Sequence, residues 1–364
     1  MKRLVFCVTN DLNYDQRMQR CCSALQEAGY DVLLVGRKRK QSPALSSQSF
    51  RQHRLNCWFE TGKLFYLEYN IRLFLYLLFV KSDALVAIDL DTIFPVYVVS
   101  RWRNKVRVYD AHELFCEMKE IVDRPAIYRV WKKLEQWMLP RFPLGYTVNQ
   151  PIAEWFKQAY KVDYAVIRNV PKPYPYEMHE RQPFILYQGA VNEGRCFETI
   201  IPAMKFIQVP LIVCGDGNFM EQAKALVKEH QLDEKVIFKG MLAPQVLKEY
   251  TLKAAVGLNI IDSKGLNNYW SLSNRFFDYI QAGLPQVTVN YPAYRQLLET
   301  YPVGLGITDP TSTEISIAVN KLLNDKALYT SAEQACKIAR EELNWEKEAK
   351  ILVNYYQTKV FCRN

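Results

Sequence analysis

The chain has 364 residues, of which 49% are hydrophobic and 23% charged, as in soluble globular proteins with ample core material. A single hydrophobic core usually stops growing below this length, so two domains are expected. Nine cysteines without a Cys-x-x-Cys motif, and four histidines without ligand spacing, argue against a disulfide framework and structural zinc and favour a reduced, cytoplasmic protein.

The net charge of +9 is unevenly placed. Residues 1–170 hold 26 Lys and Arg against 17 Asp and Glu, whereas residues 171–364 hold 21 of each. The excess lies in clusters, including residues 37–40, 101–107 and 132–133. These clusters fit a solvated face, and they also fit an anionic membrane surface or an anionic acceptor. Nucleic acid is not expected as a partner, because no nucleic-acid-binding module is visible.

Short apolar runs alternate with helical patterns in the first half of the chain, which predicts a parallel sheet with helices on both faces. A helix over residues 15–28 is expected to end at Gly29, a residue favoured just after a helix. The apolar segment 64–80 carries polar residues in its middle, so it predicts a buried or interfacial helix rather than a membrane span. Strands are expected at residues 4–9, 32–36, 84–88, 106–109, 146–148 and 165–167.

A proline-rich segment divides the chain. Three prolines at alternate positions in residues 171–183 forbid a helix and favour an extended linker between a domain over residues 1–170 and one over residues 184–344. An amphipathic helix in residues 345–364 is expected to pack back on the first domain. In the second domain we expect strands at 184–188, 211–214, 236–238, 255–260 and 286–289, and helices at 197–207, 219–230, 244–252, 272–282 and 293–300.

Three strand-to-helix junctions of the second domain carry residues suited to an anion. Ligands of doubly wound sheets bind beyond the carboxyl ends of the strands. At the first junction Gly189 lets the backbone pass close to a bound group, and Arg195 opens the following helix. The second junction carries Gly215 and Asp216. Ordinary strand-to-helix turns would have a similar composition, so neither junction decides alone.

The third junction, residues 265–285, is a polar loop that runs into a helix. Arg275 stands in the first turn, where the helix dipole disfavours a cation unless an anion binds there. Asp278 shares its helix face and could accept hydrogen bonds from a ribose diol; an intrahelical pair with Arg275 is the alternative. Backbone amides and hydroxyls at the start of this helix are further candidate contacts, from Ser271, Leu272, Ser273 and Asn274.

The order of these segments resembles glycosyltransferase family 4, whose members are retaining enzymes of the GT-B fold. The resemblance rests on residues 166–170, 189–195, 215–217 with 235–240, and 271–285, and spans nearly the whole chain. It implies two Rossmann-like domains facing each other across a cleft. It also implies transfer of a hexose-type sugar, with retention, from a nucleoside-diphosphate donor (UDP or GDP) to a glycan or lipid-linked acceptor, without metal or cofactor.

The resemblance implies roles for residues of the second domain. Arg195 matches the family's diphosphate-binding lysine, whereas Ala190 stands where the family has an arginine. We infer that Arg275 supplies the missing cation. Asp278 matches the second acid of the family's pair and keeps the ribose role, but Trp270 stands in place of the first. Catalysis would come mainly from stabilising the departing diphosphate, which itself assists front-face attack.

In the first domain the resemblance points to the ends of three expected strands. His112 resembles the family's histidine near the transferred sugar. The first strand lacks the family's glycine-rich loop, and Asp15 there could equally cap its helix. Asp-x-Asp at residues 89–91 binds metal in a different glycosyltransferase fold, but here we expect an acceptor-side loop without metal. The acceptor-side candidates are Asn10, Asp15, Arg17, Asp89, Asp91 and Glu113.

Two other functions fit the same residues. A nucleotide-sugar epimerase of the same fold would use acid and base groups such as His112 and Glu113, and would consume donor without acceptor. A non-catalytic nucleotide-sugar or polyanion-binding protein would use the basic first half. A Rossmann dehydrogenase is not expected, because no Gly-x-Gly-x-x-Gly follows the first strand. Peripheral docking on the inner face of the plasma membrane is compatible with the helix over residues 64–80, as is packing of that helix on the sheet.

Overall fold

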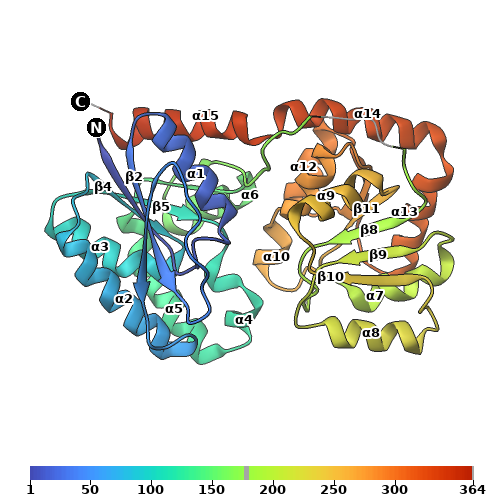
Figure 1. Ribbon diagram of the computed structural model, residues 1–364, viewed down its shortest axis with the longest axis horizontal. Helices are drawn as coiled ribbons and strands as arrows, with labels where there is room; N and C mark the ends of the chain where they lie inside the picture. Colours follow the sequence, from blue (N-terminus) through green and yellow to red (C-terminus); the bar gives the residue numbers. More distant parts are fainter. Residues whose placement is uncertain (176–179, 363–364) are drawn as a thin grey trace. The chain divides into compact units, whose positions relative to one another are not determined.

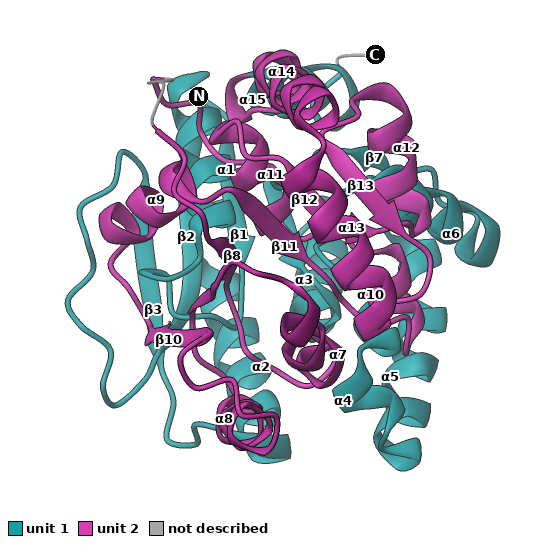
Figure 2. Cartoon of the chain, turned by 90° about the vertical axis from the view of Figure 1, so that its right-hand side faces the viewer, with its two compact units in different colours: residues 1–169, 347–364 teal, residues 170–346 magenta. Residues whose placement is uncertain are grey.

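The computed structural model describes residues 1–175 and 180–362. The chain forms two compact units (Figure 2): an N-terminal unit of residues 1–169 and 347–364, and a C-terminal unit of residues 170–346. Each unit is built on a parallel sheet with helices packed on it (Figure 1). The α/β fold class expected from the alternating strands and helices is confirmed.

The N-terminal unit contains a sheet with the strand order β3-β2-β1-β4-β5-β6-β7 in its described residues. The order reverses at β1, which lies between β2 and β4, and such switch points are where doubly wound sheets bind ligands. Its main elements are β1 (Arg3–Cys7), α1 (Gln16–Glu27), β2 (Asp31–Lys38), β3 (Arg51–Asn56), α2 (Gly62–Phe79), β4 (Ala84–Ile88), α3 (Ile93–Trp102), β5 (Val106–Ala111), α4 (Lys119–Val122), α5 (Pro125–Met138), β6 (Gly145–Thr147), α6 (Gln150–Tyr160) and β7 (Ala165–Val166).

The C-terminal unit has the strand order β10-β9-β8-β11-β12-β13 in its described residues. Here the order reverses at β8, which pairs with β9 and β11. Its main elements are β8 (Ile185–Gln188), α7 (Phe197–Ala203), β9 (Leu211–Cys214), α8 (Met220–Glu229), β10 (Val236–Gly240), α9 (Pro244–Lys253), β11 (Val256–Asn259), α10 (Leu266–Trp270), α11 (Asn274–Gln281), β12 (Gln286–Val289), α12 (Pro292–Thr300), β13 (Gly304–Ile307), α13 (Ser312–Asn324), α14 (Lys326–Glu342) and the start of α15 (Trp345–Tyr355).

The elements that the sequence analysis missed lack a clear apolar pattern. β3 reads Arg-Gln-His-Arg-Leu-Asn and lies at a sheet edge, where it pairs with β2. β13 reads Gly-Leu-Gly-Ile and lies at the edge of the other sheet. Both strands form because backbone groups of a neighbouring strand are available for pairing. The side chains of the two strands do not predict this pairing. The polar loop expected before α11 contains the short helix α10.

The described parts of the proline-rich segment, residues 171–175 and 180–183, pack against the C-terminal unit. Arg181 donates hydrogen bonds to the carbonyls of Leu252 (2.8 Å), Ala282 (3.0 Å) and Gly283 (2.7 Å). The backbone N–H of Trp345 donates to the carbonyl of Pro171 at 2.9 Å. The rest of the expected linker, residues 176–179, lies outside the described residues.

The end of the chain completes the N-terminal unit. Glu348 is buried and accepts hydrogen bonds from the backbone N–H (2.8 Å) and Nη1 (3.0 Å) of Arg168. After α15, the fully buried ring of Tyr356 lies 6.2 Å from the rings of Phe6 and Tyr30, between centroids. The helix therefore packs on the first domain, as expected, and supplies part of its core.

We expect the substitution Tyr356→Ala to destabilise the N-terminal unit by about 3–5 kcal/mol, the usual cost of deleting a buried aromatic ring. Hydrogen exchange followed by mass spectrometry measures the opening of each unit separately. The control is Ile351→Ala on the preceding helix α15, where the side chain is 43% exposed and a change within about 0.5 kcal/mol is expected. Equal loss of protection in the C-terminal unit would contradict this packing.

Candidate functional sites at the strand ends

In the C-terminal unit, a buried arginine lies beneath the first glycine turn. Arg275, in the first turn of α11, is 7% exposed, and its guanidinium stacks on the ring of Tyr187 at 4.3 Å. Gly189, next to the end of β8, has a positive φ of 112°, and a Cβ there would have the Arg275 guanidinium as its nearest neighbour, at 3.9 Å. The turn at Gly189 therefore passes close to the guanidinium without placing a side chain on it.

The hydrogen bonds of Arg275 are incomplete. Burial opposes its positive charge, but Tyr187, Tyr279 and Tyr294 together outweigh this effect and raise the pKa of the guanidinium. The Tyr187 hydroxyl itself donates to the carbonyl of Ala190 at 2.7 Å. Nη1 of Arg275 is buried and has no hydrogen-bond partner in the described residues. A buried, charged donor without a partner is costly unless a ligand completes it.

The second predicted junction is bound tightly to the first. The backbone N–H of Val191 donates to the carbonyl of Asp216 at 3.0 Å, and that of Asn218 donates to Oδ1 of Asn192 at 3.0 Å. A Cβ at Gly215 would lie 1.8 Å from the carbonyl oxygen of Gly189. Gly215 is thus required by contact between two loops of the protein. Asp216 is exposed and accepts a hydrogen bond from the next backbone N–H.

Asp278 is oriented by two buried polar side chains. Nε2 of Gln188 donates to Oδ2 of Asp278 at 3.0 Å, and Oε1 of Gln188 accepts from Oγ1 of Thr251 at 2.8 Å. Gln188 and Thr251 are both buried. Sequence reasoning missed them, although the polar Gln188 at the end of an apolar strand was a usable signal. The chain of bonds holds the Asp278 carboxylate on the same helix face as Arg275.

The start of α11 is anchored differently from the expected helix cap. The helix begins at Asn274, and the side chain of its N-cap Ser273 makes no capping hydrogen bond. Oγ of Ser273 instead donates to Oδ1 of the fully buried Asn259 at 2.5 Å, and its backbone N–H donates to the Tyr294 hydroxyl at 2.8 Å. The preceding residues are half-buried: Ser271, whose hydroxyl donates to the Asn268 carbonyl at 3.0 Å, and Leu272.

Arg195 differs from Arg275 in its surroundings. It is half-exposed, one residue after Gly194, which has a φ of 80°. Its guanidinium makes no hydrogen bond or ion pair with any of the described residues. Since β8 and β11 are adjacent parallel strands, the junctions that carry Arg195 and Arg275 leave the same edge of the sheet.

In the N-terminal unit, β4 and β5 end in an ionic cluster. His112 Nε2 lies 3.1 Å from Oδ2 of Asp110 and its Nδ1 lies 3.9 Å from Oδ2 of Asp89. Asp110 is fully buried and also pairs with Arg17, at 3.2 Å. Asp89 has a φ of 52°, a conformation that costs a non-glycine residue about 1–3 kcal/mol. Its Oδ1 accepts the backbone N–H of His112 at 2.9 Å, which helps to hold it there.

The carboxylates control the charge of His112. Burial opposes protonation of the imidazole, but Asp110 and Asp89 outweigh it and raise the pKa of His112 to about 9. Burial, with the nearby Asp91 and Glu113, raises the pKa of Asp89 to about 7 despite the opposing effect of His112. Burial of Asp110 is outweighed by Arg17 and His112, which lower its pKa. At neutral pH His112 is therefore a cation.

The remaining acceptor-side candidates are used in several ways. Arg17 is buried and donates to the Ile167 carbonyl at 3.1 Å, so it reaches His112 only through Asp110. Asp15 caps α1 by accepting from the backbone N–H of Met18 at 3.1 Å, the alternative that the sequence left open. Asn10 and Glu113 are exposed, and Asn10 donates to Asp15 at 3.1 Å. Asp91 accepts from Oγ1 of Thr9 at 2.5 Å, and burial raises its pKa to about 6.

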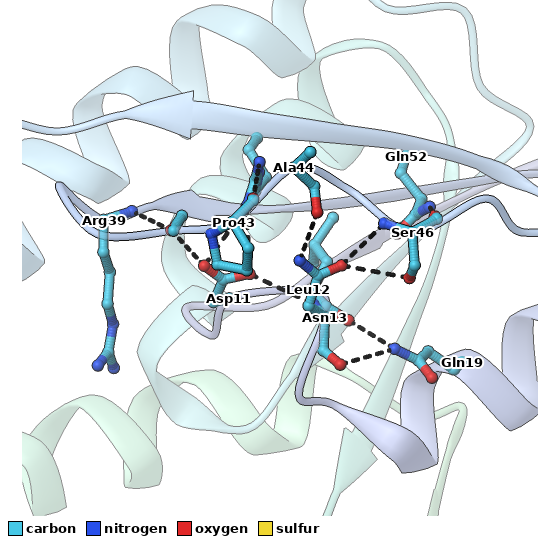
Figure 3. Close-up of polar contacts among 11 residues, drawn as sticks. Asp11, Leu12, Asn13, Gln19, Arg39, Pro43, Ala44, Ser46 and Gln52 are labelled. Atoms are coloured by element: carbon cyan, nitrogen blue, oxygen red, sulfur yellow. Dashed lines mark hydrogen bonds and ion pairs between the residues drawn. The ribbon is translucent and has the colours of Figure 1, made fainter.

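A polar cavity lies beside the loop that follows β1. Asn13 donates to the Ala44 carbonyl at 2.8 Å and accepts from the Ser46 backbone N–H at 3.0 Å (Figure 3). These bonds fix the segment after β2 against the loop. The cavity has a volume of about 410 Å³ and is lined by Asn10, Asp11, Tyr14, Asp15 and Arg39. Within the described residues, no group of three or more His, Cys, Asp and Glu side chains could hold a metal ion.

Solved structures of similar fold cover almost the whole chain. The chain matches sucrose-phosphate synthase from Thermosynechococcus elongatus with a TM-score of 0.79 and 16% identity, over 98% of each chain. HepE from Anabaena, in complex with UDP-glucose, matches with a TM-score of 0.73 and 13% identity, over 97% of this chain and 99% of that one. WaaG, a glycosyltransferase involved in lipopolysaccharide biosynthesis, matches with a TM-score of 0.73 and 16% identity, over 96% of this chain and 99% of that one. The protein has the GT-B fold.

The C-terminal unit also matches a sequence family. Residues 175–341, just under half of the chain, match the family "Glycosyl transferases group 1". That segment contains every site residue of this unit, from Gly189 to Asp278. The match supports a glycosyltransferase. Sequence comparison with curated proteins gives no match.

We expect Gly215→Ala to destabilise the C-terminal unit by about 2–4 kcal/mol, because the new Cβ would overlap the Gly189 carbonyl and force the two loops apart. The control is Gly240→Ala, where a Cβ would meet nothing within 4 Å and only the positive φ of 66° is unfavourable, at about 1–2 kcal/mol. Hydrogen exchange of the C-terminal unit measures both. Equal costs would show that the loops tolerate separation.

The raised pKa of His112 predicts how stability changes with pH. Its pKa of about 9 lies above the ordinary 6.5, so the stabilisation it provides is fully present below pH 6.5 and is lost as the pH rises through 9. The difference in unfolding free energy between wild type and His112→Gln should therefore be larger at about pH 6 than at about pH 9.5. Denaturant titrations measure it. In an Asp110→Asn background the dependence should shrink; a difference that grows with pH would contradict the ion pair.

Proposed function

We propose that the protein transfers a hexose-type sugar, with retention, from a nucleoside-diphosphate sugar to a glycan or lipid-linked acceptor, as a member of glycosyltransferase family 4. The observation that carries this proposal is Arg275: a buried guanidinium beneath an open glycine turn, with one nitrogen left without a partner in the described residues. A compact anion such as a diphosphate would supply the missing hydrogen-bond acceptor for this nitrogen.

The donor contacts follow from the three junctions. Arg275 and the N-terminus of α11 would bind one phosphate group, and Arg195 the other, since its guanidinium is half-exposed and unpaired in the described residues. Asp278, oriented by Gln188, would accept the ribose hydroxyls. The contacts of the two arginines and the helix N-terminus with the phosphates become stronger as negative charge builds up on the leaving diphosphate, which is how fixed cations lower a transition-state barrier.

His112 would contribute a positive charge on the sugar side. Nε2 lies 3.1 Å from Oδ2 of Asp110 and Nδ1 lies 3.9 Å from Oδ2 of Asp89, and the protonated ring would bring its charge to a sugar hydroxyl or to the donor phosphate. Arg17 would act as a positioning residue, since it holds Asp110. The cavity bordered by Asn10, Tyr14 and Asp15 would receive part of the acceptor. We place this activity in the cytoplasm, with the acceptor either free or at the inner membrane surface.

The epimerase alternative makes a different demand on His112. An epimerase needs a base near the sugar, whereas the carboxylates keep His112 protonated at neutral pH. The two functions separate in one assay: an epimerase consumes the nucleotide sugar without an acceptor, and a transferase requires one. The solved complexes of HepE with UDP and with UDP-glucose make UDP-sugars the first donors to test.

We expect UDP or GDP to raise the melting temperature of the wild-type protein, and Arg275→Lys or Arg195→Ala to weaken that nucleotide by about 10- to 100-fold. Lysine keeps the charge at position 275 but loses the planar guanidinium that stacks on Tyr187. A thermal-shift titration with nucleoside diphosphates measures the effect. The control is Lys228→Ala, an exposed cation in the last turn of α8.

In an assay with nucleotide sugar and acceptor, both arginine variants should lose most of the product, and the product's anomeric proton coupling in NMR reports retention. Unchanged product formation by Arg195→Ala would refute the proposed role of the cation. Nucleotide binding with no turnover of any donor, with or without acceptor, would instead favour the non-catalytic binding protein.

A further inference from the structure

Helix α2 is apolar on both of its faces. Phe65, Tyr69, Leu73 and Leu77 form its buried face. On the opposite side lies an apolar stripe, spaced three or four residues apart: Leu64, Leu67, Ile71, Leu75 and Phe79, which are 55, 60, 51, 51 and 84% exposed. A surface helix of a globular protein usually turns polar residues outward. The outward face of α2 therefore has the composition of a buried surface.

The neighbouring helices extend this apolar surface. α2 contacts α3, and Nη1 of Arg103, at the end of α3, donates to the carbonyls of Leu77 and Val80 at 2.7 and 2.6 Å. The two helices therefore end together, and each ends in a strongly exposed aromatic side chain, Phe79 on α2 and Trp102 on α3, the latter 73% exposed. α5 adds Trp137, whose ring lies 6.4 Å from that of Phe94 on α3.

Exposed apolar side chains concentrate in this part of the protein. Among the described residues, twelve of the twenty-one exposed large hydrophobic side chains fall within residues 58–137. Soluble monomers rarely expose contiguous apolar patches of more than a few hundred Å², and larger ones mark sites of protein or membrane contact. No described helix is long and apolar enough to cross a bilayer.

The exposed charges on these three helices are of one sign. The only acid of α2, Glu68, is bonded to Arg72 at 2.7 Å, and the only acid of α5, Glu135, is buried. α3 contains no acid. The exposed charges are cations: Lys63 on α2, Arg101 on α3, and Arg129 and Lys133 on α5. Exposed cations together with an apolar stripe complement an anionic lipid surface, and these like charges would repel a second copy of the same face.

We propose that the outward face of α2, α3 and α5 docks on an anionic lipid bilayer. The apolar stripe and Trp102 enter the boundary between headgroups and acyl chains, and the surrounding Lys and Arg side chains contact lipid phosphates. The aromatic residues suit this boundary, where Trp and Tyr are enriched. The surface belongs to the N-terminal unit alone, so this docking does not depend on the donor chemistry proposed above.

The test is co-sedimentation with phosphatidylcholine vesicles that contain either no phosphatidylglycerol or about one-third of it. Wild-type protein should bind the anionic vesicles and release as salt is added. The triple variant Leu67→Gln, Ile71→Gln, Leu75→Gln should lose at least tenfold in partitioning. Arg101→Gln with Lys133→Gln should lose about fivefold per charge on anionic vesicles only. The control is Ile317→Gln with Ile338→Gln, which removes apolar side chains 61 and 57% exposed on α13 and α14.

All variants change exposed side chains, and circular dichroism with UDP thermal shift verifies that they fold. The proposal is overturned if wild-type protein ignores anionic vesicles or if the triple variant binds like wild type. It is also overturned if sedimentation velocity shows a dimer that the triple variant dissociates, because the face would then belong to a second copy. Arg275→Lys should bind vesicles normally, so failure of the transferase proposal is distinguishable from failure of this one.

Discussion

The C-terminal site depends on one constraint, the burial of a guanidinium that its own unit does not fully satisfy. Burying a cation costs about several kcal/mol, even after the protein relaxes around it, unless partners replace the lost water. Arg275 receives part of that compensation from the ring and hydroxyl of Tyr187, while Nη1 has no partner in the described residues. The surrounding structure holds the arginine in place: Gly189 covers it, and Gly215 packs on Gly189. The C-terminal unit therefore holds a buried cation in a fixed position with one nitrogen unsatisfied in the described residues.

The N-terminal unit handles buried charge in the opposite way. Asp110 is fully buried and is matched by Arg17 on one side and His112 on the other. These ion pairs raise the pKa of His112 to about 9, so the histidine stays protonated at neutral pH. Asp89 has an unfavourable backbone conformation, in which its side chain binds the backbone N–H of the same histidine. One unit leaves a positive charge incompletely paired, and the other uses paired charges to fix a protonation state.

The surface of the N-terminal unit combines exposed apolar side chains with cations. α2 buries one apolar face in its unit and leaves a second apolar face exposed, and the exposed charges on α2, α3 and α5 are cations. Composition alone placed the positive excess in this half of the chain. The structure adds that some of these cations lie on helices that also expose apolar side chains. The positive charge and the apolar surface therefore belong to the same helices.

The amino-acid sequence by itself determined the alternation of strands and helices, because burial on both faces of a parallel sheet demands continuous apolar runs such as residues 84–88 and 211–214, which match β4 and β9. It also placed the glycines and cations at the ends of β8 and β11. It could not find the edge strands β3 and β13, whose pairing depends on backbone groups of distant segments. Nor could it find the roles of Gln188, Thr251, Asn259 and Asp110. Only the tertiary structure decided these, because a hydrogen bond or ion pair between residues far apart in the chain exists only once packing brings them together.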